Sequence, residues 1–159
     1  MTEEPLCADA PIETHPWKPY IPQGAEVLVM GTFPPQRKRW AMDFYYPNRT
    51  NDFWPMMGLI FLGHRDALLL PGSKDFDLGA IRQLLDDRRV ALHDTCRRVR
   101  RLAGNASDKY LEVVEPVPLR EILAEMPSCR TLATTGEKAA GVIAALTSTP
   151  LPRMGEMVT

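Results

Sequence analysis

Short apolar runs and helical repeats alternate along the chain. Three apolar runs that stop at a glycine or a polar residue predict buried strands at 27–30, 90–93 and 130–134. Apolar residues recur at helical spacing over 52–62, 77–87, 118–126 and 136–146. This alternation predicts an α/β fold with three layers and a central, mainly parallel sheet, because right-handed crossovers join parallel strands.

Other segments lack such periodicity. Residues 1–25 carry prolines throughout and predict an extended lead-in that wraps the domain. Residues 31–51 predict a long loop, and loops of that length inside a compact domain are usually functional. We interpret the arginine-rich stretch after residue 93 as a polar connection, followed by a short strand or helix near 110–114.

Composition describes an ordinary globular domain. The 159 residues suit a single domain, with 45% hydrophobic and 25% charged residues. No apolar run approaches the roughly 20 residues that a membrane span needs, and the acidic N-terminus does not resemble a signal peptide. We therefore expect a soluble, cytoplasmic monomer. Cys7, Cys96 and Cys129 are too scattered for a metal site and are expected to be reduced thiols.

Charge gives a local signal only. The net charge of −1 does not indicate nucleic-acid binding. Basic residues nevertheless cluster at 37–39 and between 88 and 101. Such clusters are either a solvated face or a set of phosphate contacts.

The ends of the predicted strands indicate where a ligand would bind. In open α/β sheets, ligands bind in the crevice outside the carboxyl ends of the strands. Residues 31–35, 93–95 and 134–136 should therefore surround one crevice.

Motifs at these positions resemble the uracil-DNA glycosylase superfamily. Gly-Thr-Phe-Pro-Pro at 31–35 looks like its G-x-[DN]-P-[GY] loop. The run YYPNRTNDFW at 45–54 resembles Y-Y-x-H-P-x-N-x-F-W of hypoxanthine-DNA glycosylases, and its end resembles N-R-F-W of mismatch-specific uracil-DNA glycosylases. VALHDT at 90–95 with NASD at 105–108, and TTGEKA at 134–139, resemble two further motifs. The likeness spans about residues 15 to 146.

The resemblance implies a DNA glycosylase that hydrolyses the N-glycosidic bond of a deaminated base, uracil or hypoxanthine, in base excision repair. It implies damaged DNA as partner and neither cofactor nor metal. Aligned positions assign catalytic roles to Asn51, Thr32 and Phe33, and base binding to Tyr46, Asp94 and Asn48. The positions aligned with DNA contacts are Gly136, Lys138, Ser107, Arg97 and Arg100.

Structural roles compete with these assignments. Phe53, Trp54 and Tyr46 also suit a core, and Asn51 suits a helix N-cap. His93 is equally consistent with a satisfied buried histidine. We expect His15 and His64 on the surface.

The chain departs from the family pattern at three points. Phe33 replaces the water-positioning residue, and Asp94 replaces an asparagine that reads the base. A carboxylate only accepts hydrogen bonds unless it is protonated. The second catalytic motif of the family would lie beyond residue 159, so we expect a domain without its last strand and helix. Two alternatives follow: a weak or inactive member that binds DNA or a nucleotide, and a hydrolase of a non-DNA N-glycoside.

Overall fold

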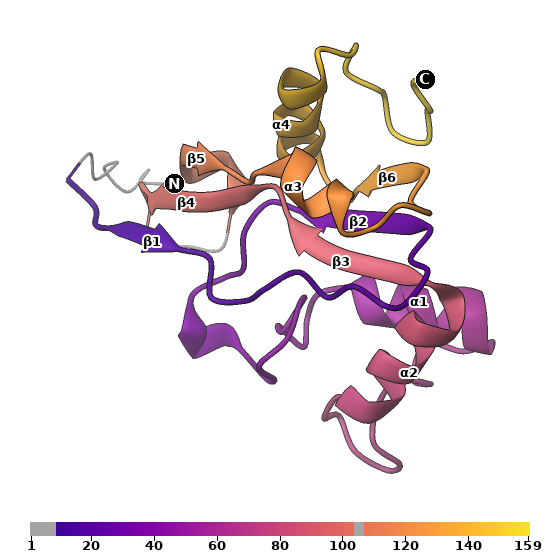
Figure 1. Ribbon diagram of the computed structural model, residues 1–159. Helices are drawn as coiled ribbons and strands as arrows, with labels where there is room; N and C mark the ends of the chain where they lie inside the picture. Colours follow the sequence, from indigo (N-terminus) through magenta and orange to yellow (C-terminus); the bar gives the residue numbers. More distant parts are fainter. Residues whose placement is uncertain (1–8, 104–106) are drawn as a thin grey trace.

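Two three-stranded sheets and the helices around them make up the fold (Figure 1). The computed structural model describes residues 9–103 and 107–159. In chain order, the elements are β1 (Ile12–Thr14), β2 (Val27–Gly31), the 3-10 turn η1 (Arg37–Arg39), α1 (Phe53–Leu62), α2 (Leu78–Arg88), β3 (Val90–Asp94), β4 (Cys96–Arg101), the 3-10 turn η2 (Asp108–Tyr110), β5 (Leu111–Pro116), α3 (Leu119–Ala124), β6 (Thr131–Thr134) and α4 (Glu137–Thr147).

The three predicted strands form a parallel sheet in the order β3-β2-β6. Val27 lies opposite Val90 on one side and opposite Thr131 on the other. These strands are therefore adjacent and parallel, as predicted. Leu28 and Met30 point to one side of β2 and are fully buried, whereas Val29 packs on the other side. The sheet thus carries a hydrophobic core on each face.

The remaining strands form an antiparallel sheet in the order β1-β4-β5. The α/β class is therefore correct, but the expectation that the strands are mainly parallel holds for β2, β3 and β6 alone. β4 occupies the stretch expected to be a polar connection, and β1 lies inside the expected extended lead-in. Thr95 joins the sheets: its N–H donates to the Gly31 carbonyl at 2.8 Å, and its carbonyl accepts from Val117 N at 2.9 Å.

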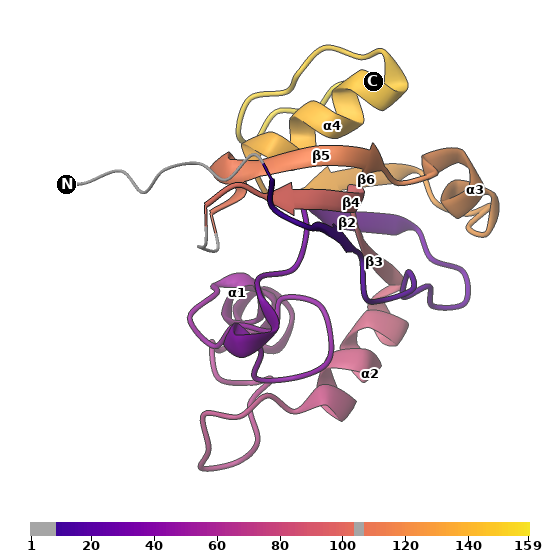
Figure 2. The ribbon, with the colours of Figure 1, turned by 90° about the vertical axis from the view of Figure 1, so that its left-hand side faces the viewer.

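Helices cover the parallel sheet from both faces (Figure 2). Helices α1 and α2 lie on one face, over a core that contains Tyr45, Trp54 and Leu85. Helices α3 and α4 lie on the other, over Leu28, Met30 and neighbouring apolar residues. The two faces bury their apolar side chains separately, so the polar ends of the strands are left at the edge of the sheet.

Local signals set the helix ends. The Asp77 side chain accepts from Ala80 N at 3.0 Å and caps α2. Gly63, with φ of 90°, ends α1 in the left-handed conformation that glycine adopts without strain.

Three further observations concern the described part of the chain. It contains no helix long and apolar enough to cross a membrane. It contains no group of three or more His, Cys, Asp or Glu side chains placed to hold a metal ion. Cys96 and Cys129 are free thiols, and Cys7 lies outside the described residues.

Candidate functional site

The carboxyl ends of β2, β3 and β6 meet around Gly31. A Cβ atom on Gly31 would lie 2.9 Å from Asp94 Oδ1, 3.2 Å from the Tyr46 hydroxyl oxygen and 3.5 Å from Thr135 Oγ1. Any side chain at position 31 would therefore collide with the Asp94 carboxylate. Three polar oxygens from distant parts of the sequence thus converge where the glycine leaves space.

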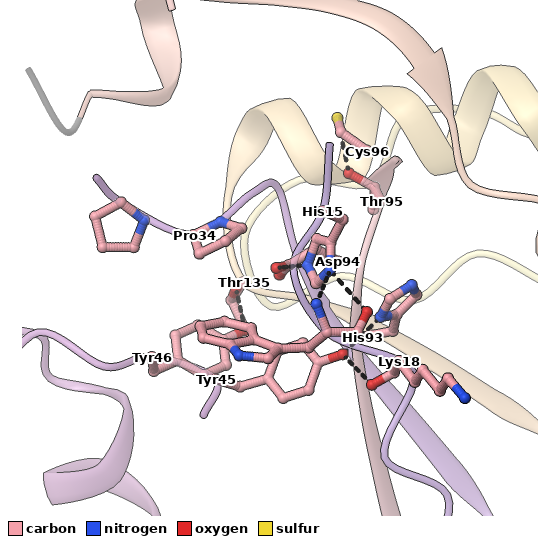
Figure 3. Close-up of polar contacts among 12 residues, drawn as sticks. His15, Lys18, Pro34, Tyr45, Tyr46, His93, Asp94, Thr95, Cys96 and Thr135 are labelled. Carbon is pink, nitrogen blue, oxygen red and sulfur yellow. Dashed lines mark hydrogen bonds and ion pairs between the residues drawn. The ribbon is translucent and has the colours of Figure 1, made fainter. Parts of the chain in front are cut away.

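Asp94 is paired with His15 inside the wall of this site (Figure 3). His15 Nε2 donates to Asp94 Oδ2 at 2.7 Å, and the side chains of His15 and Asp94 are 3% and 8% exposed. The expectation that His15 lies on the surface is therefore wrong. The residue follows β1, and its backbone N–H donates to the Arg97 carbonyl at 2.8 Å, which carries the ring under the strand ends.

His93 is a satisfied buried histidine. The Tyr45 hydroxyl donates to the Lys18 carbonyl at 2.8 Å, so the bond of 2.7 Å between Tyr45 and His93 uses the Nδ1–H of His93 as donor. Burial, and the adjacent His15, lower the pKa of His93 to about 4, although Asp94 acts in the opposite direction. The ring is neutral at physiological pH, so His93 supports the site without a charge.

Tyr46 lies at the site in a strained backbone conformation. Its φ is 52°, in the left-handed region, and its hydroxyl bonds to Thr135 Oγ1 at 2.9 Å. Burial and the charge of Asp94 raise its pKa above the ordinary value. The ring stacks on Phe53 at 3.8 Å between centroids and 20° between planes. One face of the Tyr46 ring is thus covered by Phe53.

Asn51 and Asn48 form local turns. Asn51 Oδ1 accepts from Phe53 N at 2.8 Å and so satisfies the first N–H of α1, whereas the N-cap residue is Asp52, whose side chain makes no capping bond. Asn48 Oδ1 accepts from the N–H and the hydroxyl of Thr50. The structure thus brings Tyr46 and Asp94 together at Gly31, and connects Asn51 to them through Phe53.

Thr32 and Phe33 line the loop after β2. Thr32 is buried, and its carbonyl accepts from Cys96 N at 3.1 Å. The Phe33 ring meets His15 edge-on at 5.5 Å and lies 5.7 Å from the Arg101 guanidinium. Phe33 is thus packed as an apolar wall of the loop.

Asp108, on η2, is a site residue that sequence reasoning missed. Burial raises its pKa, the Thr32 hydroxyl lowers it, Asp94 raises it, and the positive charges of Lys138 and Arg101 lower it. An acid with a raised pKa beside a candidate site is a candidate for proton transfer. Asp108 ends the NASD stretch that resembles a family motif, but the resemblance assigned a role to Ser107 and none to Asp108.

The arginines of β4 are paired with carboxylates. The pairs are Arg97–Glu115 at 3.5 Å, Arg98–Glu115 at 3.6 Å, Arg100–Glu112 at 3.3 Å and Arg101–Glu13 at 2.9 Å. Arg101 is buried and also donates to the Pro34 carbonyl at 2.9 Å, which ties the loop after β2 to β1.

The other residues predicted to contact DNA differ in exposure and in their contacts. Lys138 donates to the Leu111 carbonyl, whereas Gly136 is exposed before the first turn of α4. Ser107 is exposed, and Asn105 lies outside the described residues.

A cavity of about 240 Å³ lies away from the strand ends. Its wall combines apolar side chains of α1 and the following loop with three basic residues, namely Arg49, Arg65 and Lys74. Arg49 pairs with Asp75 and Arg65 with Asp52, so two of the three charges are already balanced.

Comparison with known proteins supports the fold. No family model matches the chain, and no curated protein matches it. A solved NMR structure from Methanosarcina acetivorans, provisionally named a uracil DNA glycosylase, aligns with a TM-score of 0.64 and 22% identity, and the alignment covers 91% of this chain and 80% of that chain. The chain shares the fold of that protein.

Proposed function

We propose that this chain is a DNA glycosylase-like protein that hydrolyses the N-glycosidic bond of a deaminated base. The observation that carries the proposal is the convergence of Asp94, Tyr46 and Thr135 around Gly31, at the carboxyl ends of parallel strands. The fold shared with a protein provisionally named a uracil DNA glycosylase adds support.

In the proposed reaction, the base is turned out of the stack and enters the space beside Gly31. The face of Tyr46 opposite Phe53 stacks on the base, a contact worth about 1–3 kcal/mol. Asp94 accepts an N–H of its edge, and Asn51 orients the sugar and the attacking water. The glycosidic bond breaks with its electron pair going to the base, and water adds to the anomeric carbon to give an abasic sugar.

Activation of water cannot come from Phe33, because its side chain is apolar. We assign this role to Asp108, whose pKa is raised by burial and which interacts with Thr32 in the loop after β2. A carboxylate of that kind accepts the proton of water as the bond to the sugar forms.

A second candidate function is binding of damaged DNA without cleavage. Two observations favour it. Phe33 packs against Arg101, and the Asn51 side-chain oxygen already accepts a hydrogen bond from Phe53 N at the start of α1. In that case the site would recognise a base and release it unchanged.

An excision assay separates the two functions. Oligonucleotides that contain uracil, hypoxanthine or xanthine are incubated with the chain, and abasic sites are counted after alkaline cleavage. Excision of at least one base supports the glycosylase. Tight binding of a damaged oligonucleotide without excision supports the second function, and absence of both contradicts the proposal.

The Asn51→Ala variant tests the catalytic role of the amide. If Asn51 acts in the transition state, turnover falls more than binding does. If Asn51 is a cap alone, the variant loses about 1 kcal/mol of stability and keeps its excision rate per folded molecule.

A further inference from the structure

A residue from the start of the chain holds the Asp94 carboxylate from behind. His15 Nε2 donates to Oδ2, whereas Oδ1 is the oxygen next to Gly31, 2.9 Å from where a Cβ of that residue would lie. Because the bond to His15 is 2.7 Å long and both side chains are nearly buried, the carboxylate is not free to rotate. The two oxygens of Asp94 therefore have different surroundings.

His15 is itself fixed. Its Nδ1 faces the backbone of Trp17. The Trp17 carbonyl oxygen lies at 3.0 Å, and the Trp17 backbone nitrogen lies at 3.2 Å. The ring stacks on Tyr45 at 5.9 Å and meets Phe33 edge-on at 5.5 Å. The His15 ring is thus held in place by its neighbours and in turn fixes the orientation of the Asp94 carboxylate, as residues that support a functional side chain do.

We propose that His15 is a positioning residue that turns one oxygen of Asp94 towards the bound base and so sets which base edge the site accepts. This inference rests on the proposed function. A carboxylate oxygen accepts a hydrogen bond and does not donate one. With Oδ2 held by His15, Oδ1 is matched by a single N–H, such as the ring N–H that deamination creates in uracil and hypoxanthine.

Methylation of that ring nitrogen provides the test, because it removes the donor and leaves the rest of the base in place. Two single-stranded oligonucleotides are compared, identical except for hypoxanthine or 1-methylhypoxanthine. Their dissociation constants are measured by fluorescence anisotropy for the wild type, His15→Leu, His15→Gln and the control His64→Leu, which changes an exposed histidine on another part of the surface. Thermal melting checks that each variant is folded.

The wild type should prefer the unmethylated oligonucleotide by about tenfold or more, as expected for a hydrogen bond to a charged group. His15→Leu should lose most of this preference, His15→Gln should recover part of it through its side-chain N–H, and His64→Leu should keep it. An undiminished preference in folded His15→Leu would overturn the inference, and so would its absence in the wild type with tight binding of both oligonucleotides.

If the wild type binds neither oligonucleotide more tightly than unmodified DNA, the proposed function fails, and the positioning role is decided by NMR. The Asp94 carboxyl carbon signal should then move in His15→Leu and stay in place in His64→Leu. An unchanged Asp94 signal in His15→Leu would overturn the positioning role.

Discussion

Two regions contain most of the polar residues discussed above, the strand ends around Gly31 and strand β4, and their polar side chains are arranged differently. At the strand ends around Gly31, His15 and Asp94 are buried and bonded to each other, and Tyr46 and Thr135 complete the site. On β4, four arginines face three glutamates on β1 and β5, because Arg97 and Arg98 share Glu115. At the strand ends, a few polar groups surround one glycine, whereas on β4 the charged side chains form ion pairs across the strands.

This difference shows that a dense row of arginines in a sequence does not by itself reveal how much of its charge is left unpaired in the fold. An arginine that faces a glutamate on the next strand has little net charge to offer a phosphate, and partly exposed pairs add at most about 1 kcal/mol to stability. A buried pair next to an open backbone position is more informative, because burying such groups is costly without a partner.

The largest expected effect is a pH dependence of stability that arises from His93, beside the strand ends. Above pH 6.5, His93 is neutral in both the folded and the unfolded chain. As pH falls from 6.5 to about 4, the unfolded chain takes up a proton that the folded chain refuses, so stability should fall by about 3 kcal/mol. Urea unfolding at several pH values measures this.

The variant His93→Phe isolates the effect. Asp108, whose pKa is raised, works in the opposite direction, because the folded chain protonates it first and gains stability as pH falls. The wild-type curve minus the His93→Phe curve removes that contribution. Parallel curves for the two proteins would show that His93 is not the group responsible.

The Gly31→Ala variant tests the close approach at the strand ends. Its methyl group would lie 2.9 Å from Asp94 Oδ1, so stability should fall by about 1–3 kcal/mol and binding of a deaminated base should be lost. In the control Gly141→Ala, the added methyl group meets nothing within 4 Å and lies inside α4, where alanine stabilises by up to about 1 kcal/mol. Equal behaviour of the two variants would mean that the strand ends are not closely packed.

The Glu115→Gln variant tests whether ion pairing on β4 restrains its arginines from binding DNA. It frees Arg97 and Arg98 at once, so non-specific DNA affinity should rise and the salt dependence of binding should steepen by up to about 2 in slope, at a stability cost below about 1 kcal/mol. Binding titrations at several salt concentrations measure the slope. Glu121→Gln removes the same charge from an exposed position on α3 and serves as control. A slope that is the same in both variants would show that the pairing does not restrain these arginines.

The sequence predicts the parallel half of the fold well. Strands β2, β3 and β6 and helices α1 to α4 lie within a residue or two of the predicted ranges, because each has an apolar run or a helical repeat of its own. Strand β4 was missed since its arginines are balanced by glutamates on other strands, and register shifts near Arg98 disturb its alternation.

The candidate site was predicted in part for a similar reason. Asp94 lies at the end of β3, beside Gly31 at the end of β2, and Tyr46 belongs to a motif in the long loop that returns to the same place. His15 lies 79 residues from Asp94 in a proline-rich segment, and no local pattern indicates such a pair. Asn51 shows the converse, because its side chain makes a local bond to Phe53 N at the start of α1, next to the N-cap residue Asp52.

Chemical-shift mapping can locate the residues that respond to a deaminated base. Backbone N–H signals of the chain are followed while a single-stranded oligonucleotide with one hypoxanthine is added, and again with the unmodified oligonucleotide. We expect the hypoxanthine-dependent shifts to concentrate at Gly31, Tyr46, Asp94 and Thr135, with smaller and base-independent shifts on β4. Hypoxanthine-dependent shifts confined to β4, or to the cavity beside Arg49 and Lys74, would contradict it.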